Sequence, residues 1–174
     1  MSPFAFWYLL IAVPVALVVV WLGWAQFIGA GWSPTPQDVV DRMLELAKLS
    51  DSDLLYDLGS GDGRIVISAA KKYGTRAVGY EVDPLRVWLS RLSVRMNRVG
   101  DKVQIVRKNI FDVDLSPATV VSMFLTQKTN QKLKPKLLQL KAGTRVVTYT
   151  WTFDEWEPEA ADFELKAYLY VVGQ

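Results

Sequence analysis

The sequence predicts an α/β fold, a Rossmann-like, doubly wound and mostly parallel sheet that is preceded by one N-terminal transmembrane helix. Two observations predict the sheet: short apolar runs alternate with helical patterns from residue 38 onward, and a glycine-rich turn, G-S-G-D-G at 59–63, follows the first run. Strand–helix repeats need crossover connections and therefore favour parallel strands. A third observation, an uncharged apolar leader, predicts the membrane helix. We expect an anchor over 1–30, a linker over 31–37 and one α/β domain over 38–174.

The leader contains no Lys, Arg, Asp or Glu; all of these lie at residue 38 or beyond. Phe4 to Ala25 is 22 residues long. A helix of that length spans about 33 Å, enough for a hydrocarbon core of about 30 Å. Aromatic side chains cluster at both ends of the run, as in the interfacial belts of membrane helices. A cleaved signal peptide would have a basic start and a shorter apolar core, so we expect one spanning helix.

From residue 38 onward the expected elements alternate regularly. An amphipathic helix over 38–49, capped by Thr35, comes first. The expected strands lie at 53–58, 76–81, 102–107, 118–125 and 144–151, with an antiparallel-type strand at 163–172. The expected helices between them lie at 63–74, 84–100 and 131–143. Gly74 closes the first of these three helices and Pro84 starts the second.

Large apolar side chains recur at helical spacing within 84–100. We expect this stripe to be the buried face of its helix, and it consists of Leu85, Trp88, Leu89, Leu92 and Met96. Three arginines on the same helix are expected to face solvent: Arg91, Arg95 and Arg98.

The 174 residues include neither cysteine nor histidine. This excludes a disulfide framework, a thiol nucleophile, serine–histidine triads and zinc sites built on Cys or His. The formal net charge of +2 is too small to indicate a nucleic-acid-binding protein. The composition therefore favours chemistry that comes from a bound organic cofactor, and we expect no metal.

The turn at 59–63 differs from the loops that bind phosphate groups. A dinucleotide loop has the pattern G-x-G-x-x-G, whereas here the third glycine comes one residue early, and no P-loop Gly-Lys-Ser/Thr follows. Two acids, Asp57 and Asp62, lie at the turn and would repel a diphosphate. They suit a ligand that bears an ammonium or sulfonium group.

A third acid, Glu81, ends the second expected strand, 22 residues after Gly59. Ligands of open α/β sheets bind at the carboxyl ends of the strands, where an acid at this spacing accepts hydrogen bonds from ribose hydroxyls. The predicted ligand is therefore a nucleoside with a free ribose, a positive centre and little or no phosphate. S-adenosylmethionine meets these conditions. The alternative is a degenerate Rossmann-like domain that binds nothing.

Two motifs, D-L-G-S-G-D-G-R at 57–64 and G-Y-E-V-D-P at 79–84, resemble motif I and the acidic motif of class I (seven-strand) methyltransferases. More narrowly, the chain resembles a small family of protein lysine methyltransferases with archaeal, bacterial and mitochondrial members. The mitochondrial members have an apolar segment before the catalytic domain and modify the adenine nucleotide translocase and the c-ring protein of the ATP synthase. Further matching segments are S-P-T-P (33–36), L-R-V-W-L-S-R (85–91), V-D-L-S (113–116) and the K-L-L…L-K-A-G-T-R-V-V run (136–147).

The resemblance implies S-adenosylmethionine as the cofactor and residues 38–174 as the methyltransferase domain. The three glycines of the turn would line the backbone cradle, Asp57 would hold the methionine end and Glu81 the ribose. Asn109, where an acid is usual, would accept a hydrogen bond from the adenine amino group through its amide oxygen. Thr35 would close the methionine end. The expected cofactor-binding set is Thr35, Asp57, Gly59, Ser60, Gly61, Asp62, Gly63, Glu81, Asn109, Ile110 and Phe111.

The resemblance also implies a protein substrate with a target lysine, which can itself be embedded in a membrane. Two segments that shape the substrate channel depart from the family pattern, F-L-T-Q-K at 124–128 and T-W-T-F-D-E-W at 150–156. Burial of the lysine amine in such a channel lowers its pKa, so no dedicated base is required and none is named. The candidate channel residues are Thr126, Gln127, Tyr149 and Trp151.

Two other functions stay open: a methyltransferase for a lipid or small molecule, and a non-catalytic S-adenosylmethionine-binding domain. Nucleic-acid substrates are disfavoured, because cytosine-C5 chemistry needs a cysteine and the Asn/Asp-Pro-Pro-Tyr/Phe motif is absent after the fourth strand. With the leader, we expect a single-pass membrane protein, held by its N-terminal helix, with the catalytic domain on the cytoplasmic or matrix side.

Overall fold

The computed structural model describes residues 8, 10–20 and 33–174. The chain divides into two compact units, Met1–Ser33 and Pro34–Gln174. In the first unit the described residues 8 and 10–20 are helical, and their side chains are exposed. None of the helices within these described ranges combines the length and hydropathy needed to cross a membrane. Much of the predicted anchor, and the first two residues of the predicted linker, lie outside the described residues.

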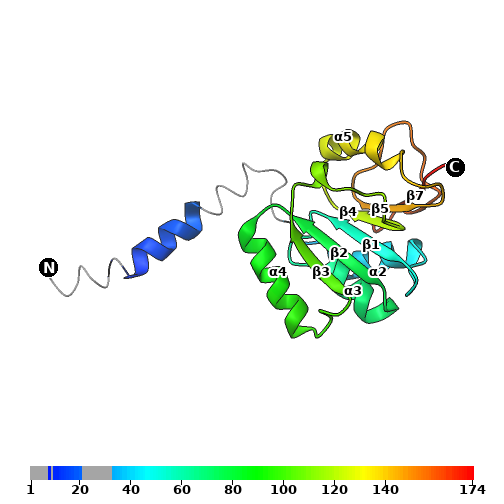
Figure 1. Cartoon of the computed structure of the whole chain (residues 1–174). Coiled ribbons are helices and arrows are strands. Elements are labelled where there is room, and N and C mark those ends of the chain that lie inside the picture. The colour runs from blue at the N-terminus through cyan, green and yellow to red at the C-terminus, as the bar shows by residue number, and fades with distance from the viewer. Residues whose placement is uncertain (1–7, 9, 21–32) are drawn as a thin grey trace. The chain divides into compact units, whose positions relative to one another are not determined.

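The second unit is built on one sheet, which has seven strands within residues 34–174, in the order β3-β2-β1-β4-β5-β7-β6 (Figure 1). The strands are β1 (Leu54–Leu58), β2 (Arg76–Glu81), β3 (Val103–Arg107), β4 (Val120–Met123), β5 (Arg145–Tyr149), β6 (Ala160–Asp162) and β7 (Ala167–Val171). β1 to β5 are parallel, whereas β7 is antiparallel to both of its neighbours. The strand order reverses beside β1, which creates a topological switch point there. The predicted α/β fold with a mostly parallel sheet is confirmed.

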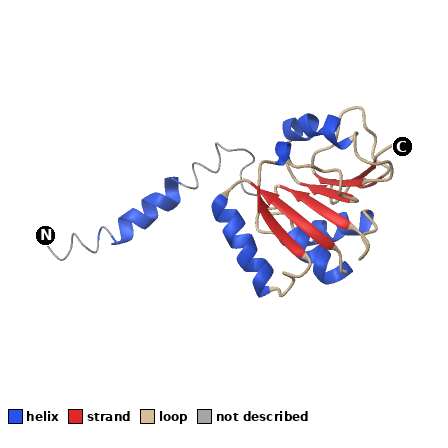
Figure 2. Ribbon diagram, in the orientation of Figure 1, coloured by secondary structure: helices blue, strands red, loops and turns tan. Residues whose placement is uncertain are grey.

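Helices cover both faces of the sheet (Figure 2). They are α2 (Gln37–Leu46), α3 (Arg64–Tyr73), α4 (Pro84–Met96), the short 3-10 helix η1 (Ile110–Asp112) and α5 (Gln127–Leu137). α2, α3 and α4 pack on one face, and α5 packs on the other. Side chains of a strand alternate between faces, so Leu55 of β1 enters the first core while Tyr56 and Leu58 enter the second.

Several predicted boundaries shift by a few residues. The N-cap of α2 is Pro36, so the predicted capping by Thr35 is wrong; the Thr35 carbonyl instead accepts a hydrogen bond from Arg64. α5 begins at Gln127, because Thr126 caps it, and it continues through Pro135. The short edge strand β6 was not predicted, and it pairs with β7.

The predicted buried stripe of α4 is wrong, because the stripe faces solvent. The exposed fractions of its side chains are 38% for Leu85, 61% for Trp88, 41% for Leu89, 42% for Leu92 and 75% for Met96. The buried residues of α4 are the small ones, Val87, Ser90 and Val94. A Cβ on Gly63 would be only 3.3 Å from the Cβ of Ser90. The helix approaches the rest of the domain too closely for large side chains at this contact.

Candidate functional site

The carboxyl ends of the parallel strands bring the predicted site residues to one edge of the sheet. Asp57 and Glu81 lie at the carboxyl ends of β1 and β2, and the turn at 59–63 connects β1 to α3. Asn109 follows β3, Thr126 follows β4, and Tyr149 is the last residue of β5. The cofactor candidates therefore gather around β1, β2 and β3, and the channel candidates around β4 and β5.

The glycine turn folds back over β2. The amides of Gly59 and Ser60 both donate to the Tyr80 carbonyl, at 2.9 and 3.0 Å. Its three glycines have φ values of 81°, 54° and 82°, in the left-handed region that side chains disfavour. A Cβ on Gly79 would lie 2.7 Å from the Ser60 hydroxyl, so a glycine in mid-strand lets the turn rest on β2. The turn exposes backbone at the head of α3, as a close-fitting ligand requires.

Glu81 is buried and fixed by backbone amides. Its Oε2 accepts a hydrogen bond from the Gly61 amide at 3.0 Å. Its Oε1 accepts from the amides of Val82 and Asp83, at 2.9 and 3.0 Å. An ionised carboxylate has about four acceptor positions. These three bonds therefore leave about one position for a hydroxyl of a ligand. The carboxylate lies against the turn in the place where the sequence predicts a ribose.

Asp57 is the most perturbed acid of the site. It is 2% exposed, and its Oδ1 accepts a hydrogen bond from Ser122 Oγ at 2.8 Å. The buried Oδ2 has no partner within residues 33–174. Burial raises the pKa of the carboxyl to about 7, against the hydrogen bond from Ser122, and the negative charges of Glu81 and Asp62 raise it further. An unpartnered buried acid favours a cationic or hydrogen-bond-donating ligand.

Arg64 connects three parts of the site. Its guanidinium binds the Asp62 carboxylate, with Nη2 at 2.6 Å from Oδ2, and its Nη1 donates to the Thr35 carbonyl at 2.7 Å. The pKa of Asp62 is lowered, because the hydrogen bonds and charge of Arg64 outweigh the effect of burial. Thr35, which is buried, is thereby connected to the turn through Arg64. The negative charge of Asp62 is compensated, so Asp57 is the acid that favours a positive ligand.

The adenine side is more open. Asn109 caps η1, and its Oδ1 accepts a hydrogen bond from the Phe111 amide at 3.1 Å. Phe111 is 43% exposed. Ile110 packs against the second core, and β3 lies beside β2, which carries Glu81. The three residues therefore lie beyond Glu81, on the side where a nucleoside base would extend from its ribose.

The acceptor side has polar groups that are only partly used. Thr126 caps α5, and Gln127 Nε2 donates to Asp154 at 3.1 Å. Asn130, which is 1% exposed, donates to the Trp151 carbonyl at 3.0 Å. The side-chain oxygens of Gln127 and Asn130 are buried and lack a partner in the described part of the chain. Two buried amide oxygens are suited to receive the N–H groups of an amine.

Aromatic residues lie at the carboxyl ends of β4 and β5, and Tyr149 packs against the core on the face of the sheet that α2, α3 and α4 cover. Tyr149 packs against Phe124, with ring centroids 4.5 Å apart. Trp151 is 43% exposed. Of the four predicted channel residues, Thr126 and Gln127 begin α5, while Tyr149 ends β5 and Trp151 follows it. Phe124 and Asn130 were not among the predicted residues, although both lie within three residues of a predicted one.

Comparisons with known proteins agree with this geometry. The model of the ANTKMT methyltransferase domain matches residues 57–160. This chain belongs to that family. A protein-lysine N-methyltransferase of Saccharolobus islandicus is 46% identical over 149 residues, which cover 81% of this chain and 92% of that protein.

Other similar proteins are longer. A mouse (Mus musculus) lysine N-methyltransferase that is named for the c-type protein of the ATP synthase is 38% identical over 106 residues, 60% of this chain and 42% of that protein. The adenine nucleotide translocase lysine N-methyltransferase of the same organism is 41% identical over 108 residues, 61% and 47% of the two chains. This chain thus spans less than half the length of both mouse proteins.

A solved structure identifies the cofactor. An RNA methyltransferase from Salinibacter ruber, in complex with S-adenosyl-L-homocysteine, is 45% identical and has a TM-score of 0.78. The alignment covers 80% of this chain and 94% of that one. The chain is therefore an S-adenosylmethionine-dependent methyltransferase, as the turn and Glu81 predicted. The unpartnered Asp57 oxygen and the glycine turn fit this cofactor. The individual cofactor-binding residues stay predictions, as do the channel residues.

Proposed function

We propose that this chain transfers a methyl group from S-adenosylmethionine to a lysine side chain of a protein substrate. The observation that carries the proposal is Asp57, buried and half unpartnered beside the glycine turn, together with the two buried amide oxygens of the acceptor side. The names of the archaeal and mouse relatives support lysine as the acceptor.

The residues of the chain then have separate tasks. When bound, S-adenosylmethionine would supply an electrophilic methyl group, whose S–C bond is replaced by the new N–C bond, with a neutral thioether as the other product. Asp57 and the turn hold the positive end, and Glu81 holds the ribose. The amide oxygens of Gln127 and Asn130 accept hydrogen bonds from the amine and align it. Tyr149 and Phe124 exclude water, which lowers the pKa of the lysine amine and lets its proton leave to solvent.

Calorimetry with S-adenosylmethionine tests the donor half. Glu81→Ala should weaken binding about 100-fold, because it removes charge-assisted hydrogen bonds and a restraint on the turn. Glu164→Ala, at an exposed position in the β6–β7 turn, is the matched control and should bind as the wild type does. Equal affinity of the Glu81→Ala variant would contradict the assigned ribose position.

Methyl-labelled cofactor and native membranes test the acceptor half. We expect label on lysine after protease digestion and amino-acid analysis, and loss of that label in Asn130→Leu. Label in the lipid extract alone would favour the lipid alternative. Label that ribonuclease releases would favour RNA, the substrate class named for the Salinibacter ruber protein. Cofactor binding without label in any fraction would favour a non-catalytic domain.

We also propose that the chain is a single-pass membrane protein, anchored through residues 4–25, with its catalytic domain on the cytoplasmic or matrix side. The uncharged apolar composition of this segment supports the anchor. Leu17→Glu together with Val13→Lys should move the full chain from the carbonate-resistant membrane pellet to the supernatant. Retention of this variant in the pellet would show that residues 4–25 do not anchor the chain in the membrane.

A further inference from the structure

Helix α4 exposes a continuous apolar face. Leu85, Trp88, Leu89, Leu92 and Met96 are all between 38% and 75% exposed, and Val82, just before the helix, is 45% exposed. At about 100° per residue the five helical positions fall within an arc of about 100°. The buried residues Val87, Ser90 and Val94 lie on the opposite side. A contiguous apolar surface on a folded domain indicates an interaction site.

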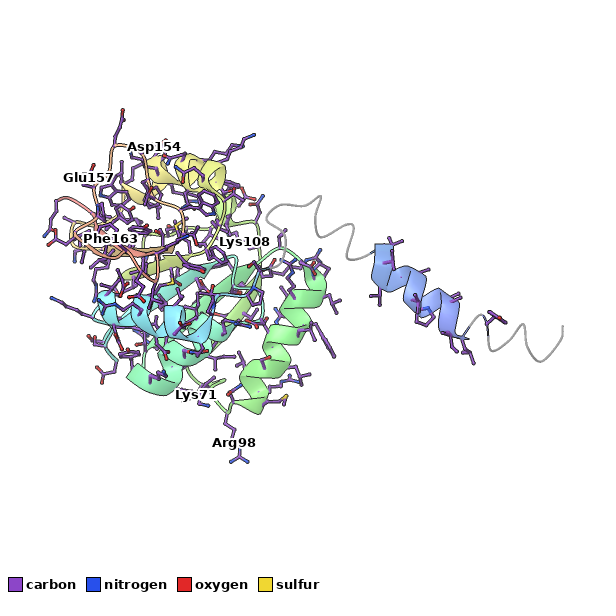
Figure 3. The ribbon with its side chains drawn as sticks, turned by 180° about the vertical axis from the view of Figure 1, so that it is seen from behind. Lys71, Arg98, Lys108, Asp154, Glu157 and Phe163 are labelled. Carbon is purple, nitrogen blue, oxygen red and sulfur yellow. The ribbon has the colours of Figure 1, made fainter. Side chains whose placement is uncertain are left out.

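The same helix is strongly basic. α4 itself includes three arginines and neither Asp nor Glu, and a fourth arginine, Arg98, follows it; Arg86 is paired with the N-cap Asp83 at 3.9 Å. Arg91 and Arg95 flank one side of the apolar face at helical spacing, and Arg98 extends away from the end of α4 (Figure 3). Arg91 also donates to the Ile105 carbonyl of β3 at 2.9 Å, which fixes the helix on its strand. Arg91 therefore has a fixed position beside the apolar face.

We propose that α4 is an interfacial helix that docks this domain on an anionic lipid bilayer. Its apolar face would lie at the boundary between headgroups and acyl chains, with the Trp88 indole in the interface where such rings accumulate. Its flanking arginines would contact anionic headgroups. The apolar face matches the hydrocarbon, and the unbalanced positive charge matches the lipid phosphates, so a bilayer fits both properties at once.

Docking through α4 also orients the site. The apolar face begins at Val82, directly after Glu81, at the carboxyl edge of the sheet. That edge would lie close to the membrane surface, where lysines of a membrane-embedded protein emerge. The docking itself needs no methyl transfer, so its test and the test of the proposed lysine chemistry can fail separately.

The absence of cysteine allows one label per molecule. Leu92→Cys in the full chain places an environment-sensitive fluorophore on the apolar face. Phe163→Cys is the matched control, because Phe163 is an exposed apolar residue, 78% exposed, on the side of the domain away from α4 (Figure 3). Both variants are inserted into vesicles of phosphatidylcholine alone or with phosphatidylglycerol, and quenching by nitroxide-labelled lipid is measured. Unchanged binding of S-adenosylmethionine verifies the fold of each variant.

We expect lipid quenching at residue 92 and none at residue 163, and only when anionic lipid is present. Adding Arg95→Gln and Arg98→Gln, which leave the Arg91 bond to β3 intact, should lower the equilibrium constant for docking about 30-fold, since each basic side chain near an anionic surface contributes about a factor of five. Equal quenching at residue 92 with and without anionic lipid would overturn the role of charge. A label at residue 92 that stays in water would overturn the docking. If the label at residue 92 is shielded from water increasingly as the protein concentration rises, the apolar face of α4 binds a second copy of the chain and the docking on lipid is overturned.

Discussion

The two ends of strand β1 carry buried aspartates in opposite surroundings. Asp53, before the strand, accepts hydrogen bonds from Ser50 and Thr119 at 2.8 to 2.9 Å and forms an ion pair with Arg145. Burial alone would raise the pKa of Asp53, but these partners outweigh it and lower the pKa. Asp57, at the other end, has only Ser122 as a partner in the described part of the chain, and its pKa is raised to about 7.

The difference separates an acid that holds the fold from one that is available to a ligand. The partners of Asp53 are all internal, so removing it would leave Arg145 with an uncompensated charge. Asp57 is destabilised in its charged form until a positive or donating group arrives. Two residues of the same type, similarly buried, thus have different functions because of the donors around them.

The largest expected effect is at Asp53. Asp53→Ala should lower the free energy of unfolding by about 4 kcal/mol at pH 7, because it breaks a buried ion pair and leaves one partner unpaired. Urea denaturation followed by circular dichroism measures this. Asp51→Ala, at an exposed position of the same turn, should change the free energy by less than about 0.5 kcal/mol. Similar losses of stability in both variants would mean that the effect belongs to the turn as a whole and not to the buried carboxylate of Asp53.

The next effect is a pH dependence of stability at Asp57, with a sign opposite to that expected from the lowered pKa of Asp53. The folded pKa of Asp57, about 7, exceeds the unfolded value of about 3.9. The contribution of protonated Asp57 to the free energy of unfolding is therefore fully present below about pH 4 and is lost as the pH rises through 7. Asp57→Asn removes this loss, so the cofactor-free variant should be up to about 4 kcal/mol more stable than the wild type at pH 8 and should bind S-adenosylmethionine more weakly. Parallel stability curves from pH 4 to 8 would contradict the raised pKa.

The smallest effect compares one hydroxyl partner at each end. Ser122→Ala removes the described donor to Asp57 and should cost about 1 kcal/mol at pH 8. Thr119→Val leaves Asp53 with Ser50 and Arg145 but also removes the acceptor of the Leu54 amide, 2.9 Å away, and should cost about as much. Thermal unfolding at pH 8 measures both. A larger loss in Thr119→Val would mean that the donors of Asp53 act as one network rather than as substitutes for one another.

The turn and Glu81 could be predicted from the sequence because backbone geometry determines their residue types. Left-handed φ values call for glycine at 59, 61 and 63, and an acid at the end of β2 has little freedom of position. The same holds for the parallel pairing of the strands, which the alternating pattern indicated. Sequence patterns were therefore sufficient where the backbone conformation of a short segment determines which residue types fit.

Contacts between distant segments could not be predicted in this way. The bond from Ser122 to Asp57 joins β4 to β1, and Arg64 reaches back to Thr35. The orientation of α4 depends on Ser90 fitting beside Gly63, which no periodicity reveals. A stripe of large apolar residues predicts a face, but which face meets the sheet is decided by the shape of the sheet surface.

The hydrogen bond from the Gly61 amide to Glu81 has a consequence for the kinetics of ligand binding. The carboxylate predicted to receive the ribose already holds the turn in its folded shape. The entropy of ordering the turn is therefore lost when the protein folds, before any nucleoside arrives. We expect association in a single rapid phase whose rate rises linearly with cofactor concentration, without a slow closing step.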